Sequence, residues 1–147
     1  MTLKEFIATG DRFAAKSGVE VLSVTQGTAC ARLVVGVDHL NAGGVCQGGA
    51  IFTLADTALA LVANSGLMLT LSVDAAIYYH KAAFEGDVLT ADAVVVCAHP
   101  KLPSFEVKVT NQHGELVASF KSTCYTKKAA LPPTKDSSSV SMKFVIP

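Results

Sequence analysis

The sequence GGAIFTLADTALALVAN, residues 48–64, is apolar at nearly every position and holds one charged side chain, that of Asp56. At roughly 1.5 Å per residue, a helix over this stretch is about 25 Å long. Because nearly every face of it is apolar, other structure must surround it, and it is predicted to be the central helix of the fold. A carboxylate is seldom buried without a partner, since desolvation of its charge costs several kcal/mol, so Asp56 is a candidate functional residue.

Residues 48–73 are apolar enough to raise the alternative of a membrane span. A span would place Asp56 inside the bilayer, at a cost of roughly 2.5 to 3.5 kcal/mol on insertion scales. The polar residues Asn64 and Ser65, followed by Gly66, also interrupt the run. A buried core helix is the better prediction, and no membrane partner is expected.

The segments on either side of this helix carry helical and β patterns. Residues 2–16 have apolar side chains at spacings of three and four, with Thr2 as the expected N-cap and Glu5 as its capping-box partner. The first two strands are joined by a hairpin at Gln26-Gly27. Strands linked in this way form an antiparallel sheet with one buried face. The predicted strands span residues 19–25, 28–35, 69–79, 87–98, 104–111 and 116–126.

A chain of 147 residues, half of them apolar, is long enough for one domain with a substantial core. We predict a single α+β domain over residues 1–126. From Lys127 onward the composition shifts to Lys, Pro, Thr and Ser, which is typical of mobile termini. Residues 127–147 are therefore predicted to form a flexible polar tail.

Charge and cysteine content exclude several classes of partner and site. Twelve Lys and Arg against twelve Asp and Glu leave no net charge, so no chain-wide field is available to hold nucleic acid or an anionic membrane. Four widely spaced cysteines, no Cys-x-x-Cys motif and a polar start without a secretory signal favour a cytoplasmic location. The histidines lack metal-ligand spacing, so no metal is expected. No nucleophile-elbow serine, phosphate-binding glycine loop or dinucleotide fingerprint is present.

A series of short motifs surrounds the apolar stretch. HLNAGGVCQGG at residues 39–49 precedes LADTA at residues 54–58, and LSVD at residues 71–74 and KAAFEGD at residues 81–87 follow. Together with a long helix and an antiparallel sheet, these motifs resemble the PaaI-like (phenylacetate-degradation-type) acyl-CoA thioesterases of the hotdog fold, over about residues 5–126.

The resemblance implies an α+β hotdog fold, in which one long central helix is wrapped by a curved antiparallel sheet of five to six strands. It implies hydrolysis of acyl-CoA to free acid and CoA, with no separate cofactor because coenzyme A is part of the substrate. It also implies a homodimer with active sites shared between subunits, and a dimer of dimers. A small chain this apolar needs its open sheet edge or exposed helix side covered, which favours assembly on physical grounds too.

Two positions on the helix would carry the chemistry of thioester hydrolysis. Free N–H groups at Gly48 and Gly49, with the helix dipole, suit a developing oxyanion. The resemblance assigns Asp56 the role of nucleophile or general base, opposite the helix start of a second subunit. The alternative for Asp56 is a buried acid bonded to Thr53 or to a nearby backbone group. The alternative for the glycines is that they let the loop approach the helix closely. A bound ligand would need the same close approach.

Two further polar residues match positions of the family motif. Asn41 would orient water or the thioester, and its alternative is a loop cap. Ser72 would hold the attacking water, and its alternative is an ordinary strand hydroxyl. The chain departs from the family at the helix start, where His-Gly-Gly is usual and Gln47 stands in place of the histidine. Glutamine can form hydrogen bonds but cannot exchange a proton, so any acid–base role of this position is lost.

The substrate is expected to touch a wider set of residues. His80 and Lys81 follow the strand that the resemblance places near CoA, where a cation can pair with phosphate; the alternative is a solvated surface charge. Thr57 is a further candidate for contact with the substrate, and its alternative is a hydrogen bond within the helix. The acyl group is expected between subunits, beside Phe52 and Leu59, with room for an aryl or medium-chain group. The predicted substrate-binding residues are Gln47, Gly49, Phe52, Thr57, His80, Lys81 and Ala82.

Two other functions fit the same fold. Gln47 favours a non-catalytic acyl-CoA binding or sensing protein, whereas the presence of Asp56, Asn41 and Ser72 favours an enzyme. A hotdog hydratase or dehydratase would need a His-Asp or His-Glu pair for proton transfer, and the site histidine is the residue that is replaced. Hydrolysis of acyl-CoA is the leading prediction.

Overall fold

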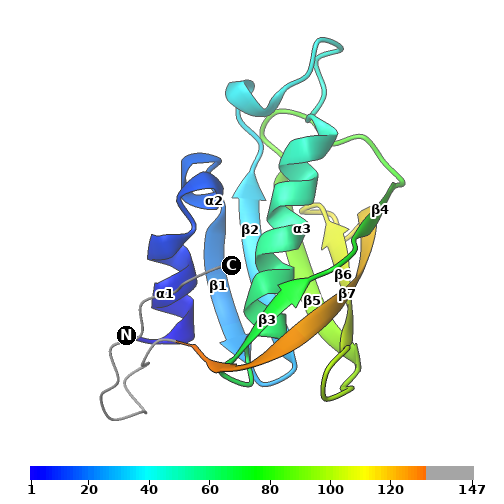
Figure 1. Cartoon of the computed structure of the whole chain (residues 1–147). Coiled ribbons are helices and arrows are strands. Elements are labelled where there is room, and N and C mark those ends of the chain that lie inside the picture. The colour runs from blue at the N-terminus through cyan, green and yellow to red at the C-terminus, as the bar shows by residue number, and fades with distance from the viewer. Residues whose placement is uncertain (132–147) are drawn as a thin grey trace.

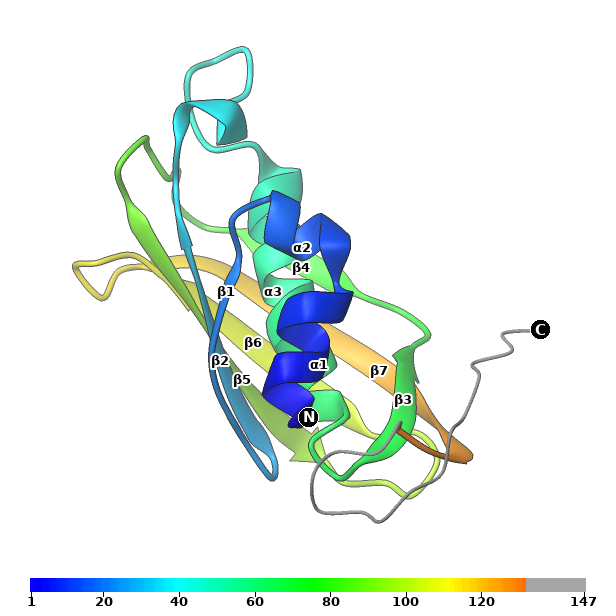
Figure 2. The same ribbon diagram turned by 90° about the vertical axis from the view of Figure 1, so that its left-hand side faces the viewer.

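The long apolar stretch forms helix α3, Gly48–Ala63, which lies along the concave side of a curved antiparallel sheet (Figure 1). This computed structural model describes residues 1–131 of the chain. Two shorter helices, α1 (Leu3–Gly10) and α2 (Arg12–Lys16), lie beside α3 near strand β1 (Figure 2). A single 3-10 turn, Val37–His39, opens the loop that leads into α3. The prediction of one central helix is confirmed.

Within residues 1–131 the sheet has seven strands in the order β1-β2-β5-β6-β7-β3, with β4 also paired to β7. The hairpin at Gln26-Gly27 joins β1 to β2 as predicted, and Gly27 has the positive φ, +86°, that a tight turn requires. The α+β hotdog architecture is thereby confirmed. The strands are β1 (Glu20–Thr25), β2 (Thr28–Val34), β3 (Met68–Ser72), β4 (Ala76–Tyr79), β5 (Val88–Cys97), β6 (Ser104–Thr110) and β7 (Leu116–Ala130).

Small side chains on the concave face let α3 approach the sheet closely. Ala31 of β2 pairs with Ala91 of β5, and neither exposes any surface. Leu54 and Leu61 of α3 are also fully buried. On the same concave face, the ring of Phe120 of β7 meets the ring of Phe52 of α3 edge to face, with centroids 5.2 Å apart.

The N-terminal segment forms two helices instead of the single predicted one. The capping box between Thr2 and Glu5 is present as expected. The helix nevertheless ends at Gly10, and Asp11 begins the next one by accepting a hydrogen bond from the Ala14 N–H at 2.9 Å. A side chain that caps a second helix competes with continuation of the first, and periodicity alone does not register this competition.

The predicted strand at residues 69–79 is divided, which is why the sheet has seven strands and not five to six. Asp74 lies in the break and accepts a hydrogen bond from the Thr123 N–H at 2.7 Å, so β3 and β4 pair with different parts of β7. Strand β7 also extends to Ala130, beyond the predicted domain boundary at residue 126. The remainder of the predicted tail, residues 132–147, lies outside the described residues. Among the helices described, none is long and apolar enough to cross a membrane.

Candidate active site

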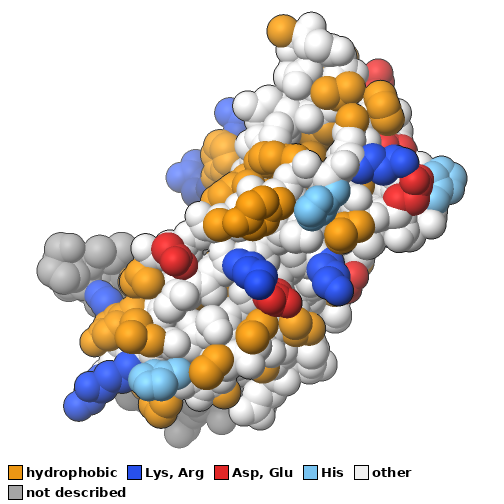
Figure 3. Space-filling model, turned by 90° about the vertical axis from the view of Figure 1, so that its right-hand side faces the viewer, with side chains coloured by type: hydrophobic (Ala, Val, Ile, Leu, Met, Phe, Trp, Pro, Cys, Tyr) orange, Lys and Arg blue, Asp and Glu red, His pale blue; other side chains and the backbone are white. Residues whose placement is uncertain are grey.

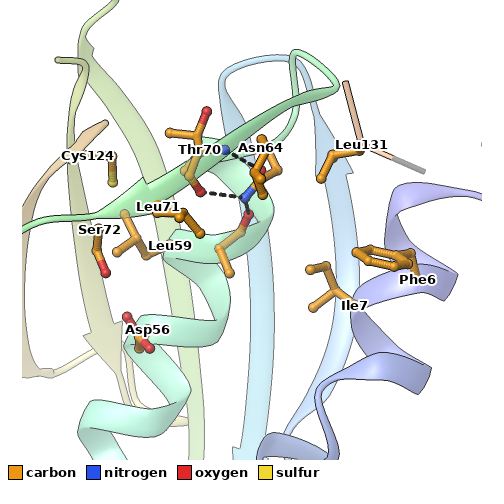
Figure 4. Close-up of a pocket in the computed structure, with 13 residues that line it drawn as sticks. Phe6, Ile7, Asp56, Leu59, Asn64, Thr70, Leu71, Ser72, Cys124 and Leu131 are labelled. Carbon is orange, nitrogen blue, oxygen red and sulfur yellow. Dashed lines mark hydrogen bonds between the residues drawn. The ribbon is translucent and has the colours of Figure 1, made fainter. Parts of the chain in front are cut away.

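Asp56 opens into a largely apolar cavity of about 370 Å³, which we call the Asp56 cavity (Figure 4). Its walls come from α1, α3, β3 and β7, and one end is held by Asn64. The Asn64 side chain accepts a hydrogen bond from the Thr70 N–H at 2.9 Å and donates to the Thr70 carbonyl at 3.2 Å, which fixes β3 to the end of α3. The lining residues are Phe6, Ile7, Asp56, Leu59, Ala60, Ala63, Asn64, Leu69, Thr70, Leu71, Ser72, Cys124 and Leu131.

The Asp56 carboxylate has no hydrogen-bond or salt-bridge partner among residues 1–131. Its side chain is exposed in the single chain, so residues 1–131 leave this side of α3 partly open. The alternative of a bond to Thr53 is also wrong, because the Thr53 hydroxyl donates to the Gly49 carbonyl. Desolvation by the apolar walls, and secondarily the charge of Asp11, raises the pKa of Asp56 above its ordinary value. Asp56 is therefore an unpaired acid that favours its protonated form more than a free carboxyl does.

Ser72 lies at the end of β3 and lines the same cavity as Asp56. Figure 4 shows the two side chains facing one space from β3 and α3, and Cys124 of β7 is the strand partner of Ser72. Burial raises the pKa of the Cys124 thiol, which makes it a poor nucleophile. The structure thus brings together two of the four predicted catalytic residues, Asp56 and Ser72.

Gly48 lines a second cavity, of about 310 Å³, which we call the Gly48 cavity. No group in the described part of the chain accepts a hydrogen bond from the Gly48 N–H, so this donor at the start of α3 is free. Three predicted substrate-binding residues, His80, Lys81 and Ala82, lie on the same walls. The lining residues are Val45, Cys46, Gly48, Ile51, Tyr79, His80, Lys81, Ala82 and Ala83.

Gln47 and Gly49 lie outside both cavities. Gln47 is the N-cap of α3, and its side-chain carbonyl accepts a hydrogen bond from the Gly49 N–H at 2.5 Å. This bond occupies one of the two donors that were predicted for an oxyanion, which leaves that of Gly48. The two residues border a separate hollow beside Phe13 and His39.

Three other predicted residues have local partners in this chain. The Asn41 side chain accepts hydrogen bonds from the Gly43 and Val45 N–H groups, at 2.9 and 3.3 Å, so it caps its own loop. Thr57 is buried and donates to the Thr53 carbonyl at 2.8 Å, and Phe52 packs against Phe120. None of these three lines the Asp56 cavity or the Gly48 cavity.

The residue that sequence reasoning missed is Tyr79, on the inward face of β4. Its hydroxyl donates to the Gly48 carbonyl at 2.8 Å. A Cβ at position 48 would lie 2.9 Å from the Tyr79 ring, so glycine is required there for packing as well as for the approach of a ligand. The alternation of Ile77 and Tyr79 could have indicated the inward face of this strand, but its partner could not be known without the topology.

The two cavities share no lining residue among those that the structure describes, and their key groups are eight positions apart on α3, from Gly48 to Asp56. At roughly 1.5 Å per residue, this separation is about 12 Å along the helix axis. One carbonyl carbon cannot lie within about 3 Å of both groups in a single chain. No group of three His, Cys, Asp or Glu suited to a metal ion occurs within residues 1–131.

The profile of the thioesterase superfamily matches residues 43–118, which include the end of the loop, α3, strands β3 to β6 and the start of β7. The chain belongs to this superfamily. An Archaeoglobus fulgidus protein described as a putative esterase is 37% identical over 132 residues, which cover 90% of this chain and 86% of that protein. The acyl-coenzyme A thioesterase PaaI of Escherichia coli is 32% identical over 111 residues, covering 76% and 79% of the two chains.

Solved structures place this thioesterase-superfamily chain in the PaaI-like group. The E. coli PaaI protein of the phenylacetic acid degradation operon superposes with a TM-score of 0.79 at 26% identity, covering 88% of this chain and 99% of that one. A hypothetical thioesterase from Streptococcus pneumoniae, solved with coenzyme A, gives 0.77 at 27% identity, covering 84% and 99%. The resemblance to PaaI-like hotdog thioesterases is confirmed.

Proposed function

We propose that this chain hydrolyses acyl-CoA thioesters to the free acid and CoA. The observation that carries the proposal is the unpartnered Asp56 carboxylate at an apolar cavity of about 370 Å³, in a chain of the thioesterase superfamily. An apolar cavity with one unpaired acid suits an acyl group whose reacting carbon lies at the polar end. The E. coli relative is named an acyl-coenzyme A thioesterase, and the pneumococcal one was solved with coenzyme A.

In the proposed reaction, the Gly48 N–H donates a hydrogen bond to the thioester oxygen and stabilises the charge that develops there. Asp56 then acts in one of two ways. As a nucleophile, its carboxylate oxygen bonds to the carbonyl carbon, the C–S bond breaks to release the CoA thiolate, and water hydrolyses the mixed anhydride. As a general base, it takes a proton from water that attacks the same carbon, and the C–S bond then breaks to release the CoA thiolate, which takes up a proton. We propose that the Ser72 hydroxyl, which lines the same cavity as Asp56, holds that water.

A site built from two subunits follows from the separation of these groups. Because about 12 Å of helix lies between Gly48 and Asp56, the donor and the acid that act on one thioester come from different chains. We propose a homodimer with two such sites, and a dimer of dimers as the larger assembly. The exposed face of α3 that carries Asp56 is the side left open for a second copy.

The CoA moiety would lie toward the Gly48 cavity, near His80 and Lys81. Lys81 forms a salt bridge with Glu115 at the surface, so a phosphate has to compete with this carboxylate for the ammonium group. Figure 3 shows that basic and acidic side chains are intermixed on this side of the molecule. We therefore expect the CoA phosphates to make local contacts here, and no broad positive field to attract them. We also propose that the protein is located in the cytoplasm.

A non-catalytic acyl-CoA binding protein is the second candidate. The observation that favours it is the Gln47 side chain, which occupies the Gly49 N–H and cannot exchange a proton. The free Gly48 N–H and the unpartnered Asp56 favour hydrolysis, because a binding protein has no need of an unpaired acid beside the acyl group. Turnover distinguishes the two candidates.

The test measures release of CoA from short, medium, long and aryl acyl-CoAs. Chromatography detects the released CoA, because the four cysteine thiols of the protein would interfere with a thiol reagent. The wild-type protein is compared with Asp56→Asn and with Asp92→Asn, an exposed acid on β5 that borders neither cavity. We expect wild-type and Asp92→Asn proteins to release CoA and Asp56→Asn to release almost none. If the folded wild-type protein binds CoA esters but releases no CoA, the proposal of hydrolysis is overturned and the non-catalytic binding protein is supported.

A further inference from the structure

We propose that Tyr79 is a positioning residue, whose hydroxyl holds the first turn of α3 so that the Gly48 N–H points at the thioester oxygen. The inference rests on the proposed function, because it concerns the donor of that reaction. Tyr79 lies on β4, a short strand that pairs with β7 and is separated from β3 by a break. In this way the sheet brings a phenol to the start of a helix that lies 31 positions earlier in the chain.

The start of α3 needs an external support. Gly48 and Gly49 are its first two residues, and glycine lowers helix stability by about 1 kcal/mol relative to alanine because its backbone is so free. A first turn built on two glycines would fray and sample several directions of its N–H groups. A donor aimed at a developing oxyanion is effective only when its direction is fixed before the reaction.

Two side chains clamp this turn from opposite sides of one peptide group. Tyr79 donates to the Gly48 carbonyl at 2.8 Å, and the N–H of the same peptide group, at Gly49, donates to Gln47 at 2.5 Å. Hydrogen bonds at both ends of one amide polarise each other and hold its plane. The peptide plane between Gly48 and Gly49 is therefore held, and the Gly48 N–H, which lies in the preceding peptide plane, has fewer directions to sample.

The packing of the ring adds to the effect of the hydroxyl. The ring lies so close to Gly48 that a Cβ there would be 2.9 Å from the ring and 3.0 Å from the hydroxyl oxygen. Burial beside the helix start, and secondarily the Cys46 thiol, raises the pKa of Tyr79, so its hydroxyl keeps the proton that it donates. Tyr79 also lines the Gly48 cavity, yet half of its surface is exposed, so it is not a core residue on which folding depends.

The test compares Tyr79→Phe, which removes only the hydroxyl, with the matched control Tyr78→Phe on the opposite face of the same strand. Tyr78 pairs with Ser119 and borders neither cavity. For Tyr79→Phe we expect kcat to fall about fivefold to tenfold with KM changed less than about twofold, as for loss of one hydrogen bond that matters in the transition state. Tyr78→Phe is expected to match the wild type in both constants.

A second readout does not depend on turnover. Hydrogen exchange of the Gly49 amide, followed by NMR, is expected to be about fivefold faster in Tyr79→Phe and unchanged in Tyr78→Phe. An active wild type whose kcat and Gly49 exchange are both unaffected by Tyr79→Phe would overturn the positioning role and leave the proposed hydrolysis standing. A lower Tm without a change in kcat would overturn it as well. If the wild type releases no CoA, the proposed hydrolysis fails, and Gly49 exchange alone then supports or overturns the clamp.

Discussion

Gly48 and Asp56 lie on the same helix, about 12 Å apart along its axis, and they face different cavities. The free N–H of Gly48 suits the oxygen of a thioester, and the unpaired carboxylate of Asp56 suits attack on its carbon. Neither cavity alone contains both groups. This separation is the structural reason to propose that each active site combines two copies of the chain.

Replacement of Gly48 by proline isolates the contribution of its N–H. Proline is well tolerated at the first position of a helix, and Gln47 before it already has the extended backbone, φ −65° and ψ 134°, that a following proline requires. We expect kcat of Gly48→Pro to fall about 10²-fold. The matched control is Gly48→Ala, whose Cβ meets the Tyr79 ring in the same way but whose N–H remains. Equal losses in both variants would assign the effect to crowding and not to the donor.

Asp56→Asn is expected to be more stable than the wild type at neutral pH. Because the fold raises the pKa of Asp56 above 3.8, the folded state disfavours the ionised form, and this destabilisation is present above the raised pKa. It disappears as pH falls below the unfolded value. We therefore expect Tm of the variant to exceed that of the wild type at pH 7 and the difference to shrink as pH falls, vanishing only well below the unfolded value of 3.8. A wild type that is the more stable protein at pH 7 would show that a native partner stabilises the carboxylate.

The acid limb of the pH–activity profile is expected to follow Asp56. Activity requires the ionised carboxylate, so kcat/KM should rise with pH through a pKa above 3.8. Asp11→Asn removes the smaller of the two causes of the raised pKa and keeps a side-chain oxygen to cap Ala14. We expect the limb to move to lower pH in Asp11→Asn and to stay in place in Asp92→Asn. If the acid limb does not move in Asp11→Asn, the limb reports the ionisation of a group other than Asp56.

Much of the fold could be predicted because its signals are local. The apolar run of residues 48–64, the hairpin at Gln26-Gly27 and the capping box at Thr2 each depend on residues close in sequence, and each is found in the structure. The break at Asp11 and the division of the strand at Asp74 depend on competing hydrogen bonds, the second of them with Thr123 far along the chain. Periodicity carries no signal for such distant partners.

The candidate site divides in the same way. Asp56 and Gly48 are evident from sequence because an acid in an apolar helix and glycines at its start are unusual. The Gln47 cap and the contact of Tyr79 with Gly48 were not predictable, because the first depends on a side-chain rotamer and the second on the pairing of β4 with β7. The role given to Asn41 followed from resemblance, and Phe52 and Thr57 were expected near the substrate. In this chain the side chains of all three have partners within the chain.

The range of acyl-chain lengths that the enzyme accepts is expected to depend on Ala63. This residue lines the far end of the Asp56 cavity and also borders the neighbouring hollow, so a larger side chain there would shorten the space beside α3. We expect Ala63→Leu to lower kcat/KM about tenfold or more for long acyl-CoAs and to spare short ones. The short substrates are the internal control. A uniform loss over all chain lengths would place the acyl group elsewhere.

The shared active site is tested most directly by mixing two inactive variants, Asp56→Asn and Gly48→Pro, under conditions in which subunits exchange. Each mixed dimer would contain one site with both defects and one site with neither. With equal amounts and random exchange, we predict recovery of roughly a quarter of wild-type CoA release, while each variant alone keeps about a hundredth or less. Native mass spectrometry checks that mixed dimers form. Mixed dimers without recovered activity would contradict the account, because they would show that the donor and the acid of one site belong to the same chain.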